Sequence, residues 1–246
     1  MIILHQSLSL FMTREIVFIR HAESDLHTAK ERAKLIAGDQ PLPNFLKNLS
    51  VWDDLESSIG LTKKGIQQAT TLANELECPE GVEILSSPLN RARLTALLYV
   101  KNHFGSGYFD KVRLEKLLLE IPLEIEITKI VAMAKIKQET GVEVLEQWLN
   151  YDNDRIQIIL EKARLRILNL LTFLNKSGNS TALCFGHRIF MGLFQTLIEN
   201  NLLQTPISEI TDFHTFIINL NNNILKVPNA QPIPYSISEI IKNLKI

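Results

Sequence analysis

The chain has 246 residues, 46% of them hydrophobic and 22% charged, which is typical of a folded globular protein and excludes extensive disorder. This length is enough for one large α/β domain. The formal net charge is only −1, so we expect neither nucleic acid nor a membrane as a partner. No apolar run approaches the ~18 residues that a membrane span requires. With two cysteines and no CxxC pair, the sequence excludes a disulfide scaffold and predicts a cytoplasmic protein.

The beginning of the chain predicts a loose extension followed by a buried strand. Residues 1–12 lack the basic start and the cleavage site of a signal peptide, so we interpret them as an extension before a single domain over 13–246. Residues 16–19 form an unbroken β-branched and aromatic run, which suits a strand buried on both faces of a parallel sheet. Arg20 and His21 follow at the carboxyl end of that strand, where open α/β sheets bind their ligands.

The next part of the chain predicts an insertion, a helix, a strand and a second helix. Residues 27–59 mix charges and prolines with only partial helical period, and so long a connection suggests a lid over the site. Thr62 is suited to cap a helix that ends near Cys78, and residues 82–86 have the pattern of a short strand. The following helix places Arg91 near its N-terminus. The apolar face of the first helix consists of Ile66, Ala69, Leu72, Ala73 and Leu76.

The second half of the chain predicts another insertion and four further elements. Residues 108–151 are the least regular, and we interpret part of them as a second lid. A helix over 154–175 has the strongest period, and residues 181–185 form another buried strand. We expect an apolar helix over 190–200 and a strand over 213–220. The tail beyond that strand, which carries asparagines and prolines, is interpreted as peripheral.

Two of the predicted strands end in the same way, with His21 and His187 at their carboxyl ends. Because parallel strands place those ends at one edge of the sheet, we expect the two imidazoles to face each other. Arg20 and Arg91 add two fixed cations, and the helix N-terminus beside Arg91 favours anions. The sequence therefore predicts a phosphate pocket. The alternative is a pair of satisfied core histidines beside structural ion pairs, and the matching strand ends make it the weaker interpretation.

These residues belong to motifs that follow one another in the order of a known family. The motifs are Arg20-His21-Ala22-Glu23-Ser24, Leu61-Thr62 with Gly65 and Gln68-Ala69, Ser87-Pro88-Leu89 with Arg91-Ala92 and Thr95-Ala96, and Gly186-His187. Over about residues 16–220 the chain resembles the histidine phosphatase superfamily, also called the phosphoglycerate mutase-like family. The resemblance implies a three-layer α/β sandwich, with a mostly parallel central sheet and helices on both faces.

The resemblance also implies a role for each residue of the pocket. His21 is the nucleophile that takes the phosphoryl group. Arg20 and Arg91 grip its oxygens, and His187 completes the pocket. The chemistry agrees, because a neutral imidazole is a competent nucleophile and guanidinium groups bind phosphate oxygens in a bidentate way. These cations supply the positive charge, and no HExxH motif suggests a metal site, so we expect neither a metal nor another cofactor.

Hydrolysis also needs a carboxyl group that protonates the leaving oxygen and later accepts a proton from water. In the family this group follows the arginine-bearing helix, often in a Leu-x-Glu context, which Leu118-Leu119-Glu120 matches best. Glu120 is therefore the candidate general acid. The alternatives that stay open are Glu115, Glu124 and Glu126.

The sequence departs from the family at several positions around the pocket. His27 stands where the mutases commonly have asparagine, and it either donates to the phosphate, as we predict, or is a solvated loop residue. Ser24 either contacts the phosphate or caps a turn. Arg188 stands where glycine is common and either adds charge for an acidic substrate or points outward. The mutase stretch Asn-Glu-Arg-His-Tyr-Gly is missing, which weighs against a glycolytic mutase.

These features together predict a metal-independent phosphomonoester phosphatase that acts on a small phosphorylated substrate through a phosphohistidine. Two alternatives stay open. A phosphohistidine protein phosphatase of the same superfamily is disfavoured by the length of the chain. A catalytically inert phospholigand-binding protein of the same fold is disfavoured by the intact arginines and histidines of the pocket.

Overall fold

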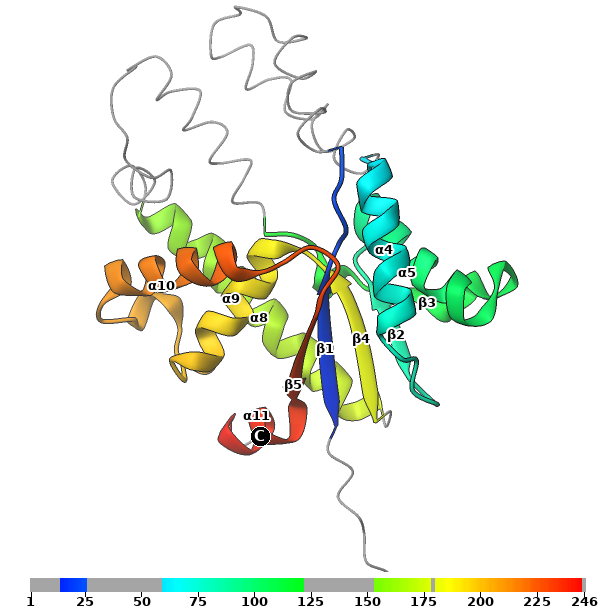
Figure 1. Cartoon of the computed structure of the whole chain (residues 1–246). Helices are drawn as coiled ribbons and strands as arrows, with labels where there is room; N and C mark the ends of the chain where they lie inside the picture. Colours follow the sequence, from blue (N-terminus) through cyan, green and yellow to red (C-terminus); the bar gives the residue numbers. More distant parts are fainter. Residues whose placement is uncertain (1–13, 26–58, 122–152, 178–179, 245–246) are drawn as a thin grey trace, which may run out of the picture.

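The computed structural model describes residues 14–25, 59–121, 153–177 and 180–244, and these residues form one sheet with helices on both sides (Figure 1). The predicted extension over 1–12 and the greater part of both predicted insertions lie outside the described residues.

The sheet has five strands in the order β3-β2-β4-β1-β5. Every pair of neighbours is parallel except β1 and β5, which are antiparallel. This mostly parallel sheet between two helical layers confirms the predicted three-layer α/β fold. The strands are β1 (Glu15–Arg20), β2 (Glu83–Ser86), β3 (Val112–Leu114), β4 (Thr181–Gly186) and β5 (Pro232–Ser236).

The helices divide into two groups. On one face of the sheet lie α4 (Lys63–Glu75) and α5 (Asn90–Phe104). On the other lie α8 (Asn153–Ser177) and α9 (Arg188–Glu199), with α10 (Phe213–Lys226) packed against α9. None of the described helices is long and apolar enough to cross a membrane. The remaining elements are α11 (Ile237–Leu244) and three short 3₁₀ helices, η1 (Ser106–Lys111), η2 (Lys116–Leu118) and η3 (Ile207–Glu209).

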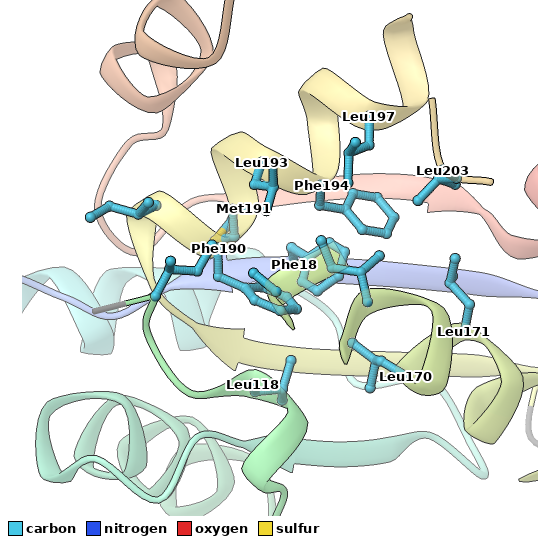
Figure 2. Close-up of a cluster of buried hydrophobic side chains, with 14 of the residues drawn as sticks. Phe18, Leu118, Leu170, Leu171, Phe190, Met191, Leu193, Phe194, Leu197 and Leu203 are labelled. Atoms are coloured by element: carbon cyan, nitrogen blue, oxygen red, sulfur yellow. The ribbon is translucent and has the colours of Figure 1, made fainter. Parts of the chain in front are cut away.

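The strand β1 is buried on both of its faces. Ile16 and Phe18 join the core beneath α8 and α9, whereas Val17 and Ile19 join the core beneath α4 and α5. Successive side chains of a strand point to opposite faces, so a strand covered on both sides needs an apolar residue at every position. Figure 2 shows Phe18 among the side chains of α9. Its ring packs edge-on against that of Phe194, with 4.6 Å between the ring centroids.

Most of the predicted helices are present, with small differences at their ends. The helices predicted over 154–175 and 190–200 correspond to α8 and α9, and α9 begins earlier, at Arg188. The helix predicted to carry Arg91 near its N-terminus is α5, which begins at Asn90.

The strand predicted over 213–220 is wrong, because these residues form the beginning of α10. Asp212 caps the helix, since its side chain accepts a hydrogen bond from the backbone N–H of Thr215 at 3.0 Å. The aromatic and β-branched residues that favoured a strand recur at helical spacing and pack in the core. The buried residues of α10 are Phe216, Ile217, Leu220, Asn223 and Ile224.

The interpretation of the tail as peripheral is also wrong. The strand β5 pairs with β1, and the ring of Tyr235 lies 6.0 Å from the ring of Phe18. Pro232 and Pro234 suggested a loop, because proline cannot donate to a ladder of hydrogen bonds. Prolines are nevertheless tolerated on an edge strand, which is the place of β5 in the sheet.

The helices α9 and α10 cross closely at Gly192. A Cβ atom added to Gly192 would lie 2.6 Å from Cγ1 of Ile224 and 2.9 Å from the backbone nitrogen and Cα of the same residue. Because the backbone of a packed helix moves aside only at a cost, glycine is required at this crossing.

We expect Gly192→Ala to lower the free energy of unfolding by about 1–2 kcal/mol, because overpacking outweighs the gain in helix propensity. Gly107→Ala is the matched control, since no atom lies within 4 Å of a Cβ at that position. Its unfolding free energy is expected to change by less than about 0.5 kcal/mol. Urea denaturation measures both variants, and a Gly192→Ala protein as stable as wild type would contradict the close crossing.

Candidate active site

The carboxyl ends of β1 and β4 bring two histidines together. Arg20 pairs with Gly186 in the ladder, and the backbone N–H of His21 donates to the Gly186 carbonyl oxygen at 3.0 Å. The residue after each strand is a histidine, and the ring centroids of His21 and His187 lie 5.4 Å apart. Both side chains are buried. The structure thus places two imidazoles side by side at this edge of the sheet.

His21 has a defined tautomer. Its Nδ1 lies 2.8 Å from the carbonyl oxygen of Ala22, and because a carbonyl only accepts, Nδ1 carries the proton. Its Nε2 accepts a hydrogen bond from Nε of Arg91 at 3.2 Å. Burial and the charge of Arg91 lower the pKa of His21 to about 3. The imidazole is therefore neutral near pH 7, and the lone pair of Nε2 is directed toward Arg91.

Ser87 belongs to the site, although its motif had suggested no separate role for it. It follows β2 directly, and its backbone N–H donates to the carbonyl oxygen of Phe185 at 2.9 Å. Its hydroxyl and Nε2 of His187 form a hydrogen bond of 2.8 Å. The signal that points to Ser87 is its place directly after a predicted strand, as for His21 and His187.

His187 is also neutral. Burial and the nearby charge of Arg91 lower the pKa of His187 well below its ordinary value. Its Nδ1 is buried and has no hydrogen-bond partner within the part of the chain that the structure describes. His187 therefore contributes a neutral imidazole with one engaged and one open nitrogen.

The helix α5 fixes the distance between Arg91 and the nucleophile candidate. Arg91 lies in the first turn of α5 and is only 1% exposed. One turn later, the hydroxyl of Thr95 donates to the Arg91 carbonyl oxygen at 2.8 Å and accepts from the backbone N–H of Ala22 at 3.1 Å. The helix that carries Arg91 is thus bonded to the residue that follows His21.

The beginning of α4 fixes the same loop from another side. Thr62 accepts from the backbone N–H of Gly65 at 2.9 Å, which confirms it as the helix cap, and its hydroxyl donates to Oε1 of Glu23 at 2.9 Å. A Cβ on Gly65 would lie 1.9 Å from the Glu23 carbonyl oxygen. Ile66, predicted to face the core, is instead 47% exposed. Gly65 takes the buried position, because α4 approaches the loop this closely.

Arg20 is held by the connection between α10 and β5. Its Nη1 donates to the carbonyl oxygen of Val227 at 3.0 Å, and its own carbonyl oxygen accepts from the backbone N–H of Ala230 at 3.0 Å. Ala230 has a φ of 47°, a left-handed conformation that alanine seldom adopts. The first arginine of the pocket therefore depends on a connection that carries no recognisable motif.

Glu120 lies at the N-terminus of α9. Its Oε1 accepts from the backbone N–H groups of Ile121 at 2.9 Å and Phe190 at 3.1 Å, and its Oε2 accepts from that of Ile189 at 3.4 Å. Donors of this kind, together with the positive end of a helix dipole, favour the ionised form of a carboxyl group.

One of the alternatives to Glu120 lies among the described residues, and it is engaged elsewhere. Glu115 caps η2 by accepting from the backbone N–H of Leu117 at 3.0 Å, and its Oε2 lies 3.8 Å from Nη2 of Arg113. Glu124 and Glu126 lie outside the described residues.

The remaining predicted site residues have different outcomes. Ser24 forms an isolated antiparallel bridge with Leu61, so the structure shows its backbone role. His27 lies outside the described residues. The phosphate contacts predicted for both residues stay predictions. Arg188 begins α9, and its charge contributes to the lowered pKa of His21, so this arginine acts electrostatically on the pocket.

Positive charge therefore surrounds two neutral imidazoles. Arg20, Arg91 and Arg188 all act to lower the pKa of His21. Across the ranges that the structure describes, no three histidine, cysteine, aspartate or glutamate side chains gather into a group that could hold a metal ion. An arrangement of this kind suits a phosphoryl group, whose oxygens accept charge-assisted hydrogen bonds from guanidinium groups.

Among known protein families, the histidine phosphatase superfamily (branch 1) matches residues 16–232. The chain belongs to this superfamily. The matched range contains every histidine, arginine and glutamate of the pocket described above. No curated protein is similar enough to this chain to count as a match.

Several solved structures are similar to this chain at low sequence identity. A phosphoserine phosphatase mutant from Entamoeba histolytica, in complex with phosphoserine, is 20% identical, with 90% of this chain and 89% of that chain covered and a TM-score of 0.39. Phosphoglycerate mutase from Bacillus anthracis is 19% identical, with coverage of 77% and 82% and a TM-score of 0.47. Mycobacterial glucosyl-3-phosphoglycerate phosphatase is 16% identical, with coverage of 80% and 82% and a TM-score of 0.39.

The lowered pKa of His21 predicts how stability depends on pH. The unfolded chain binds a proton at His21 near pH 6.5, whereas the folded protein does so only near pH 3, so stability is lost as pH falls through this window. We expect His21 to contribute a loss of roughly 1–2 kcal/mol per pH unit there. Urea denaturation of wild type and His21→Gln from pH 7 to pH 4, in buffer without phosphate, isolates this contribution. Equal slopes in the two proteins would contradict the buried neutral imidazole.

Proposed function

We propose that this member of the histidine phosphatase superfamily hydrolyses phosphomonoesters of small molecules through a phosphohistidine at His21. The observation that carries the proposal is the tautomer of His21. Its Nδ1 proton is bonded to the Ala22 carbonyl oxygen, and its Nε2 lone pair faces Arg91. A neutral imidazole with a fixed orientation is a nucleophile that needs no prior deprotonation.

In the proposed first step, Nε2 of His21 attacks phosphorus and the bond from phosphorus to the alcohol oxygen breaks. The alcohol leaves with a proton from Glu120, and the imidazole takes up the phosphoryl group. The Ala22 carbonyl oxygen stabilises the positive charge that develops on the ring, because it accepts from Nδ1–H. In the second step, water gives a proton to the Glu120 carboxylate and attacks phosphorus, so that the phosphorus–nitrogen bond breaks and inorganic phosphate is released.

The arginines supply the positive charge that this transfer requires. Nε of Arg91 already points at Nε2 of His21, so a phosphoryl group on that nitrogen meets the guanidinium group directly. Arg20 precedes the nucleophile in the chain, and His187 faces it across the sheet edge. Because guanidinium groups stabilise charge on the transferring oxygens, the proposed reaction proceeds without a metal ion.

Phosphate release from an aryl phosphate in excess chelator tests this proposal. We expect wild type to turn over and His21→Ala to lose more than about a thousandfold in rate, because no other group replaces Nε2. His214→Ala is the matched control, since it removes an exposed histidine of α10. Its rate is expected to stay within about twofold of wild type.

Each other outcome points to a different alternative. Comparable turnover in a folded His21→Ala protein would rule out His21 as the nucleophile. A folded wild type without turnover would favour the inert phospholigand-binding protein, and a rise in melting temperature with inorganic phosphate would then show the binding. Turnover of a phosphohistidine-containing protein, but of no small phosphomonoester, would favour the protein phosphatase.

The role of Glu120 is tested by substrates that differ in their leaving groups. We expect Glu120→Gln to lose about a hundredfold in kcat/KM on an alkyl phosphate but only a few-fold on nitrophenyl phosphate, because an activated leaving group needs little protonation. Glu115→Gln is the control, since Glu115 is the competing carboxylate and is engaged with Arg113. Equal losses on both substrates in Glu120→Gln would remove Glu120 from the acid role.

A further inference from the structure

Arg166 places a positive charge beside Glu120. It lies on α8, and its Nη2 donates to the carbonyl oxygen of Leu119, the residue before Glu120, at 2.6 Å. Burial lowers the pKa of Arg166, whereas the charge of Glu120 raises it. The two charged groups therefore interact, although they come from different elements of the fold.

Arg166 also contacts the helix that binds Glu120. Its guanidinium carbon lies 5.3 Å from the ring centroid of Phe190, and the backbone N–H of Phe190 donates to Oε1 of Glu120. Arg166 of α8 thus contacts both the segment that carries Glu120 and the N-terminus of α9, which donates to the Glu120 carboxyl group.

We propose that Arg166 is a positioning residue that sets the protonation of Glu120, by anchoring the Leu119 carbonyl group and by stabilising the ionised carboxylate with its charge. The proposal rests on the proton-transfer role proposed for Glu120. An opposite charge and backbone donors both favour the ionised form, so Arg166 lowers the pH at which Glu120 gives up its proton. Arg166 thereby shifts the pH range in which Glu120 acts as a general acid to lower values.

Other charged and titratable groups belong to the elements next to Glu120. Within the described ranges, η2 contributes Lys116, and the junction of β4 and α9 contributes His187 and Arg188. His187 is neutral, because burial and the charge of Arg91 lower its pKa. Arg188 begins α9, and its charge also lowers the pKa of His21. Arg166 is the cation whose bond to Leu119 ties it to the Glu120 segment.

Two substitutions separate the charge of Arg166 from its anchoring bond. Arg166→Gln keeps a donor for the Leu119 carbonyl oxygen but removes the charge, whereas Arg166→Lys keeps the charge. Arg164→Gln is the matched control on the same helix, since Arg164 pairs with Glu161 and donates to the Leu203 carbonyl oxygen. Arg166→Met is a second neutral variant in case Arg166→Gln does not fold.

The first readout is the pH profile of kcat/KM on an alkyl phosphate, whose alkaline limb reports the loss of the Glu120 proton. We expect Arg166→Gln to move this limb upward by about one pH unit. Arg166→Lys and Arg164→Gln are expected to leave the limb in place. A purely structural role of Arg166 would lower the plateau of the profile without moving its limb.

The second readout needs no turnover. The carbon-13 signal of the Glu120 carboxyl group, assigned by its loss in Glu120→Gln, gives the titration midpoint of this group directly. We expect the midpoint to rise by about one pH unit in Arg166→Gln and to stay in place in Arg164→Gln. An unchanged midpoint in Arg166→Gln would overturn the proposal. An absence of turnover in wild type would instead overturn the proposed function, while the midpoint would still decide the effect of Arg166.

Discussion

The hydrogen bond between Nε of Arg91 and Nε2 of His21 is the contact on which the rest of the site depends. A buried cation is tolerated only when its donors are engaged. Here the Nε–H group of Arg91 donates to the imidazole of His21, an acceptor that carries no charge. A phosphoryl oxygen that takes the place of the imidazole brings negative charge to a site of low dielectric. Its hydrogen bond with Arg91 is therefore stronger than the one that the imidazole makes. The resting pocket is therefore arranged for an anion.

The fold keeps this contact in place by holding both partners on one continuous core. His21 follows β1, whose side chains are packed on both faces, and Arg91 lies in the first turn of a helix that covers one of those faces. Thr95 bonds that helix to Ala22, and Gly65 brings α4 against the same loop. Because well-packed interiors resist small displacements, these contacts limit how far the guanidinium group and the imidazole separate before a substrate arrives.

The sequence predicts the features that neighbouring residues encode. It does not predict the features that depend on contacts between residues far apart in the chain. Four apolar residues before Arg20 specify a strand buried on both faces, and the fixed order of the motifs identifies the pocket. By contrast, Arg20 is bonded to Val227, which is 207 positions away, and no local pattern reveals that contact. The residues of 213–220 suit a strand by composition, but they form part of a helix that packs against α9. Two of the backbone donors to Glu120, Ile189 and Phe190, likewise come from α9, far along the chain.

The two parts of the proposed chemistry are held by different means. The nucleophile and its arginines stand at strand ends and at a helix start, whereas Glu120 is held by backbone donors and by Arg166. Donors on a carboxyl group make it a stronger acid, so once Glu120 carries a proton it transfers that proton more readily to the leaving oxygen in the first step. The second step needs a base instead. A phosphoryl group on His21 adds negative charge to the pocket. This charge counteracts the effect of the backbone donors on Glu120 and makes its carboxylate more basic. In the proposed cycle, the covalent intermediate itself thus favours the change of Glu120 from acid to base.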